Sequence, residues 1–78
     1  MYTLEVSYPL TLYWNSINVD REISEAVNAT STGSGAGFGQ RDLTFRFTTA
    51  EAANAAAERA RRIHESISCS VSADAYYA

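Results

Sequence analysis

The stretch closest to a chemical motif is T-G-S-G-A-G-F-G-Q at residues 32–40, which contains all four glycines of the chain. A dinucleotide-binding loop needs G-x-G-x-x-G between a strand and a helix, and a P-loop needs a lysine. Counted from Gly33 or Gly35, the sixth position is Phe38 or Gln40, and the chain has no lysine. The glycines therefore predict a helix C-cap and a hairpin-like connection rather than a phosphate site. The alternative is a mobile recognition loop with Phe38 at its tip.

Residues that could act as nucleophiles, bases or metal ligands are few. The chain has one cysteine, Cys69, and one histidine, His64, which excludes an internal disulfide and a cysteine-based metal cluster. A Ser-His-Asp triad could combine His64 with Asp74 and a serine, but abundant serine makes such a match expected by chance. A histidine at a helix end is explained by the helix dipole. We therefore expect a protein that is not an enzyme and binds no cofactor or metal.

Alternation of apolar and polar residues predicts three strands, over residues 2–12, 42–48 and 66–73. Pro9 cannot donate a ladder hydrogen bond, so the first strand should have an exposed edge or a bulge there. Apolar spacing predicts one helix over residues 18–29, and a capping box from Thr48 to Glu51 starts a second helix that runs to about His64. Residues 30–40 are predicted to form a loop, with or without a short edge strand.

This order of elements predicts a single α+β domain over residues 1–78. Two amphipathic helices must cover the apolar face of one sheet. A ferredoxin-like split β-α-β sandwich satisfies this requirement, with both helices on one face of a three- or four-stranded, mainly antiparallel sheet. Phe45 and Phe47 should then point under the helices, and the opposite face should be rich in serine and threonine.

The charge balance favours a protein partner. Six arginines against nine acids give a net charge of −3, which argues against generic nucleic-acid binding and mildly favours a basic partner. Asp20, Glu22 and Glu25, with Glu5 in support, form a candidate acidic patch. The alternative is that these carboxylates only solvate a helix surface.

The stretch G-F-G-Q-R-D-L-T-F-R-F at residues 37–47 partly resembles the RNA-recognition-motif family. Gly37, Phe38 and Gly39 match three positions of that family's motif. The resemblance implies a ferredoxin-like fold. The predicted outer face offers Thr44 and Arg46, which provide no stacking platform for bases.

In size, acidity, one-domain compactness and lack of a catalytic constellation, the chain resembles the small phage-encoded anti-CRISPR proteins. The resemblance implies a cytoplasmic inhibitor that docks on a CRISPR effector complex and blocks its binding to DNA. The residues expected to contact that partner are Glu5, Asp20, Glu22, Glu25 and Phe38.

Two other hypotheses stay open. One is a homo-oligomerising module that pairs through its Ser/Thr-rich sheet face or edge, because an uncharged surface does not resist such pairing. The other is a nucleic-acid-binding domain with an RNA-recognition-like layout. The chain begins without a recognisable signal peptide and has no apolar run of membrane-spanning length, so we expect a cytoplasmic location and no membrane partner.

Overall fold

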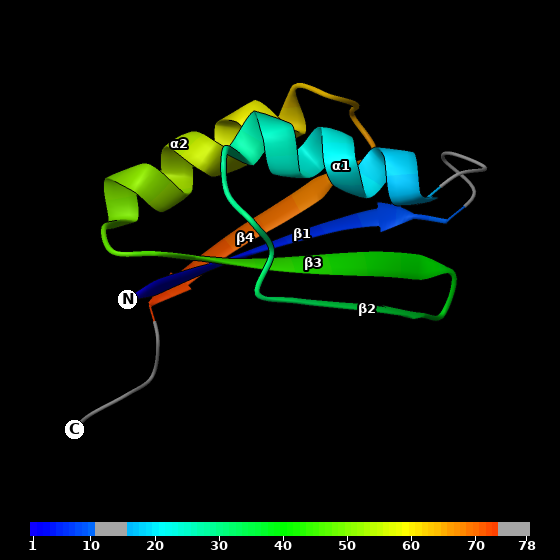
Figure 1. Ribbon diagram of the computed structural model, residues 1–78, viewed down its shortest axis with the longest axis horizontal. Coiled ribbons are helices and arrows are strands. Elements are labelled where there is room, and N and C mark those ends of the chain that lie inside the picture. The colour runs from blue at the N-terminus through cyan, green and yellow to red at the C-terminus, as the bar shows by residue number, and fades with distance from the viewer. Residues whose placement is uncertain (11–15, 74–78) are drawn as a thin grey trace.

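Four strands and two helices make up the computed structural model, which describes residues 1–10 and 16–73 (Figure 1). The strands pair antiparallel throughout, in the order β2-β3-β1-β4. This is the α+β, ferredoxin-like arrangement that the sequence predicts. The elements are β1 (Tyr2–Pro9), α1 (Ser16–Val27), β2 (Gly33–Gly37), β3 (Gln40–Phe47), α2 (Ala50–Arg61) and β4 (Ser68–Ala73).

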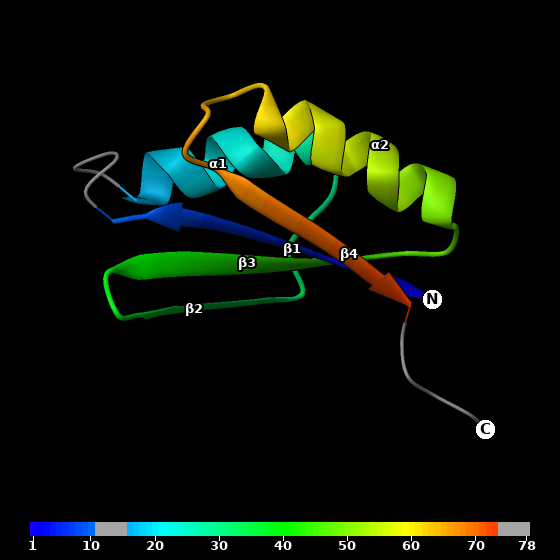
Figure 2. The same ribbon diagram turned by 180° about the vertical axis from the view of Figure 1, so that it is seen from behind.

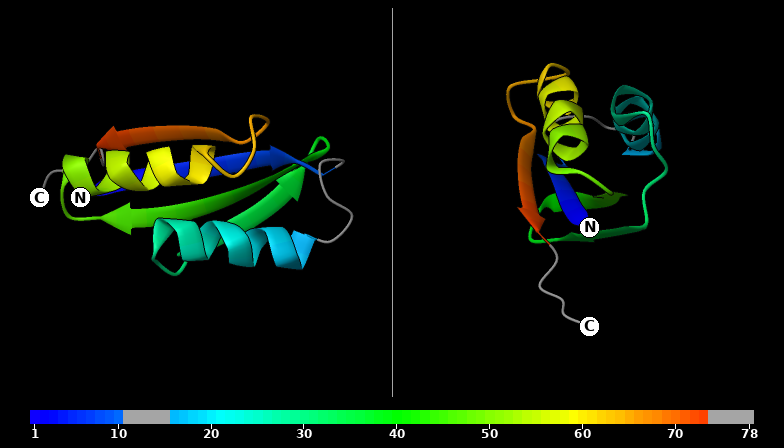
Figure 3. Two further views of the ribbon diagram at one scale, coloured as in Figure 1. Left: turned by 90° about the horizontal axis from the view of Figure 1, so that it is seen from above. Right: turned by 90° about the vertical axis from the view of Figure 1, so that its left-hand side faces the viewer.

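The helices cover only one face of the sheet, as both panels of Figure 3 show and as the view from behind in Figure 2 confirms. Phe45 is fully buried under them, as predicted, and Phe47 is half-buried against the same core. None of the described helices is long and apolar enough to cross a bilayer. The core consists of Leu4, Val6, Tyr8, Val19, Ile23, Val27, Leu43, Phe45, Ala56, Ala57, Ala60 and Ile67.

The central strand β1 follows the predicted alternation but is shorter than predicted. It ends at Pro9, which pairs with Gln40 on β3. The β4 pairing has already stopped at Ser7, so the side of Pro9 away from β3 is open and its missing N–H breaks no bond there. Leu10 lies in a turn outside the strand, and residues 11–12 of the predicted strand fall outside the described residues.

The region predicted as a loop over residues 30–40 does contain an edge strand, β2, joined to β3 by a two-residue turn. Phe38 and Gly39 form that turn with φ of 52° and 77°. Positive φ at both central positions is the type I′ geometry, whose twist matches that of the flanking strands. The glycines therefore serve a hairpin, and the structure confirms the hairpin-like connection.

Each helix has an end that differs from the prediction: the C-terminal end of α1 and the N-terminal end of α2. Helix α1 ends at Val27, because Asn28 takes a left-handed conformation (φ 62°) and its N–H donates to the Ser24 carbonyl at 2.8 Å. Asparagine, rather than a glycine of the following loop, thus terminates this helix. In α2 the N-cap is Thr49, whose hydroxyl accepts from the Ala52 N–H at 3.1 Å. The predicted capping box, with Thr48 as N-cap and Glu51 three residues later, was therefore wrong, because the N-cap is one residue further along the chain.

Arg59 joins the two helices. Its Nε donates to the Ala26 carbonyl at 2.7 Å and its Nη2 to the Val27 carbonyl at 3.1 Å. The last carbonyls of a helix lack intrahelical partners and carry partial negative charge, so a guanidinium stabilises them. Arg59 lies in the last turn of its own helix, α2. It serves the end of α1 instead.

Candidate protein interaction surface

The outer side of β2 is an open sheet edge. Among the described residues, this strand lies at one end of the strand order and pairs only with β3, and Figure 1 shows no other labelled helix or strand beyond it. All five of its residues are exposed. Ser34 and Ala36, whose side chains lie on the helix side of the sheet, are among them, so neither helix covers this strand. An open edge presents unpaired N–H and C=O groups and is a template for another strand.

The ladder geometry identifies the outward backbone groups. A two-residue turn closes on a hydrogen-bonded pair, here Gly37 with Gln40. Hydrogen-bonded and non-bonded pairs then alternate along the ladder, which turns the N–H and C=O of Ser34 and Ala36 away from β3. Two bonds support this assignment: the Thr32 N–H donates to the Thr44 carbonyl at 2.7 Å, and the Leu10 N–H to the Gly39 carbonyl at 2.8 Å.

The glycines of β2 leave its open-face side bare. Gly33, Gly35 and Gly37 pair with Thr44, Asp42 and Gln40, and a Cβ added to any of the three would meet no atom within 4 Å. Their φ angles are not in the left-handed region, so neither crowding nor backbone conformation within the monomer requires glycine here. The backbone of β2 is consequently accessible from the edge and from both faces.

Phe38 is the most exposed large apolar side chain at the described surface, with a relative exposure of 108%. It sits at the hairpin tip, as the recognition-loop hypothesis expected. A bulky residue rarely adopts φ of 52°, and doing so costs about 1 kcal/mol or more. The side chain thus contributes nothing to the core and occupies an unfavourable conformation, a combination that marks functional positions.

The four predicted acidic contacts do not form one patch. Glu22 and Glu25 are exposed on α1, whereas Glu5 alternates with buried Leu4 and Val6 and so lies on the opposite, helix-free face. Asp20 is half-buried and is paired with Tyr8 and Arg41. A partner-binding role for these acids stays a prediction, but they would act from separate surfaces.

Asp20 belongs to a network that sequence patterns did not reveal. Tyr8 Oη donates to Asp20 Oδ1 at 2.7 Å, and Arg41 Nε donates to Oδ2 at 2.8 Å, with Nη2 at 2.7 Å from the same oxygen. Burial, and then the hydrogen bond and charge of Asp20, raise the pKa of Tyr8 well above its ordinary value. The hydrogen bond from Arg41 to Asp20 raises the pKa of that guanidinium. The network ties α1 to β1 and β3.

The helix-free face is polar, as predicted. Ser7 Oγ donates to Asp42 Oδ1 at 2.7 Å across the β1–β3 ladder. Of the described strand residues on this face, none is aromatic, so the stacking surface of an RNA-recognition motif is not formed there.

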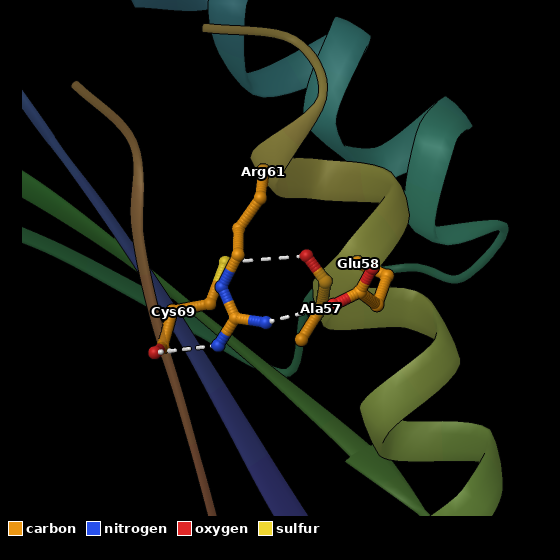
Figure 4. A network of polar contacts seen from close by, with 4 residues as sticks. All are labelled: Ala57, Glu58, Arg61 and Cys69. Atoms are coloured by element: carbon orange, nitrogen blue, oxygen red, sulfur yellow. Dashed lines mark hydrogen bonds and ion pairs between the residues drawn. The ribbon is translucent and has the colours of Figure 1, made fainter. Parts of the chain in front are cut away.

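The other edge of the sheet, β4, is partly covered (Figure 4). Arg61 Nη2 donates to the Cys69 carbonyl at 3.3 Å, and Arg61 Nη1 lies 3.5 Å from Glu58 Oε1. Cys69 is half-buried, its thiol contacts the Ala57 carbonyl at 3.7 Å, and burial raises the pKa of that thiol. An arginine from α2 therefore occupies an outward carbonyl of β4.

His64, the histidine considered for catalysis, has a structural contact in the described part of the chain. His64 Nδ1 accepts from the Ser66 N–H at 3.0 Å, which gives this side chain a role in the turn after α2. Asp74, its hypothetical triad partner, lies outside the described residues. Within residues 1–10 and 16–73, no three His, Cys, Asp or Glu side chains are placed to hold a metal ion.

Comparison of the chain with protein families, curated proteins and solved structures found no significant match. The ferredoxin-like description therefore rests on the order and pairing of the strands themselves.

Proposed function

We propose that this protein is a non-enzymatic interaction module that binds a protein partner by adding a strand to the β2 edge. The observation that carries the proposal is that edge itself. Its five residues are exposed, the N–H and C=O of Ser34 and Ala36 point outward, and no side chain of the described residues bonds to them. Strand addition provides main-chain hydrogen bonds and is a common mode of peptide and protein recognition.

Phe38 supports the same conclusion. It is fully exposed at the end of the edge, where an added strand would begin or end. Burying a phenylalanine contributes about 1.5–3 kcal/mol, which compensates for its unfavourable backbone conformation in the free protein. The edge would therefore supply hydrogen bonds and the hairpin tip an apolar contact.

A capture experiment tests the proposal. Tagged wild-type protein is incubated with lysate of the cells that express it, and the recovered proteins, its own untagged copy included, are quantified. Ala36→Pro removes an outward N–H while leaving the β3 ladder intact, and should reduce recovery at least about tenfold. Ala50→Pro is the matched control, because it places proline at the first position of α2, where the missing N–H has no helical partner and Thr49 is already extended (φ −130°, ψ 152°).

The inhibitor hypothesis is a second candidate, favoured by the exposure of Glu22 and Glu25 on α1. In that case Glu22→Gln combined with Glu25→Gln would abolish recovery of a nucleic-acid-handling complex and Ala36→Pro would not. This result would overturn the edge-binding proposal. The cytoplasmic location expected from the sequence stays a prediction under either candidate.

A further inference from the structure

Building on the proposed function, we infer that the partner of the β2 edge is a second copy of this chain. The two β2 strands pair antiparallel about a two-fold axis at Gly35. Because such an axis stands perpendicular to the sheet, both helix layers lie on the same side of the joined sheet. One continuous sheet of twice the width results, with Ser34 of each copy opposite Ala36 of the other.

The positions of the outward groups define this register. They belong to Ser34 and Ala36, which are placed symmetrically about Gly35. With the axis at Gly35, both residues of each copy exchange an N–H···O=C bond in each direction, and no outward group of β2 is left unpaired. A shift by two residues one way sets Ser34 opposite the turn at Phe38. A shift the other way sets Ala36 opposite Thr32, whose N–H already donates to Thr44.

Strand composition favours a second copy over an unrelated peptide. Strand addition gains its sequence specificity from pockets that receive alternate side chains. β2 offers no such pocket, since glycines line one side and Ser34 and Ala36 the other. β2 also carries no charged side chain, so a symmetric pairing sets no like charges opposite one another. At the two-fold axis, the two strands approach most closely at a pair without hydrogen bonds, and both residues of that pair are Gly35.

The pairing also provides a contact for Phe38. In this register the hairpin tip of one copy lies near Thr32 of the other, so both phenylalanines, fully exposed in the single chain, meet the second copy at the two ends of the interface. Ser34 and Ala36 are exposed on the helix side, so α1 does not pack against the strand that must pair.

Sedimentation velocity of the wild-type protein, from about 10 µM to about 1 mM, is the direct test, because a short edge-strand interface lies at the weak end of the affinity range. A concentration-dependent dimer is expected. Ala36→Pro should raise the dissociation constant at least about tenfold, whereas Ala50→Pro should leave it unchanged. A monomer at the highest concentration overturns the inference.

Charge pairing tests the contact between the two β2 strands. Ser34→Glu with Ala36→Glu should be monomeric, as should Ser34→Lys with Ala36→Lys, because each sets like charges opposite one another. An equal mixture of the two folded proteins, checked by circular dichroism, should form a heterodimer. Failure of the mixture to associate overturns the β2–β2 pairing.

The outcomes also separate the inference from the proposed function. If the wild type is monomeric but captures another protein in a way that Ala36→Pro abolishes, the second-copy inference fails and the edge-binding function stands. If neither association nor capture responds to Ala36→Pro, both fail.

Discussion

The two edges of this sheet differ in whether other parts of the protein cover or bond their outward N–H and C=O groups. At the β4 edge, α2 packs alongside the strand, Cys69 and Val71 are half-buried, and Arg61 bonds the Cys69 carbonyl at 3.3 Å. At the β2 edge every residue is exposed and no described side chain reaches the strand. Proteins usually protect their edges with charges, prolines or covering elements. Within the described residues, the β4 edge is therefore partly covered and the β2 edge is open.

The largest expected effect separates inward from outward groups within β2. Gly35 faces β3 with its N–H, so Gly35→Pro should lower the free energy of unfolding by about 2–3 kcal/mol, through a lost ladder bond and a fixed φ. Ala36→Pro should change it by less than about 1 kcal/mol. Denaturant unfolding measures both, and equal destabilisation would contradict the assignment of outward groups.

Tyr8 of β1 and Arg41 of β3 bond Asp20 of α1, and the stability that this network contributes should depend on pH. The raised pKa of Tyr8 means that the folded protein keeps a proton that the unfolded chain releases near pH 10. Stability from this group is therefore complete below about pH 10 and falls above it, by at most about 1.4 kcal/mol per pH unit.

Tyr8→Phe should cost about 1 kcal/mol at pH 7, because Asp20 loses a donor, and should remove this part of the alkaline decline. Unfolding curves at pH 7 to 11 for both proteins measure the difference. A variant with the same alkaline decline as the wild type would assign the dependence to other groups.

In the turn between β2 and β3, Phe38→Asn should raise the free energy of unfolding by about 0.5–1 kcal/mol. Asparagine followed by glycine suits a type I′ turn, whereas phenylalanine at φ 52° does not. Thermal unfolding measures the gain. The same variant should weaken dimer formation, and a variant that dimerises as well as the wild type would remove Phe38 from the interface.

The smallest effect on stability is expected at the partly covered β4 edge. Arg61→Ala should change the free energy of unfolding by less than about 1 kcal/mol, because its contacts are exposed. It should, however, leave the chain with two open edges and so permit assemblies larger than a dimer. Sedimentation measures this, with Arg62→Ala as a control of equal charge. No larger species would show that Arg61 does not protect β4.

Residue patterns predicted the layers of this fold because each pattern reflects a local requirement. Alternation placed Leu4, Val6 and Phe45 in the core, where the structure buries them fully. Helix ends were less accurate, since Asn28 and Thr49 act through backbone geometry that neighbouring residues could equally have provided.

The candidate interaction site was predictable only in part. Phe38 among glycines was identifiable as a tip, because an apolar residue between turn formers has little core to reach. The sequence could not distinguish the exposed acidic residues from those paired within the fold. Asp20 and Glu22 look alike there, yet one is held by Tyr8 and Arg41 and the other faces water.

By itself, the sequence determined which residues are buried and that two helices lie on one side of a sheet, because periodicity and apolar burial act along each segment. Only the tertiary structure decided which edge stays open. That outcome depends on strand order, which placed β2 at the end of the sheet, and on the reach of Arg61 from α2 to the Cys69 carbonyl of β4. Such contacts join residues distant in sequence, and no local pattern specifies them.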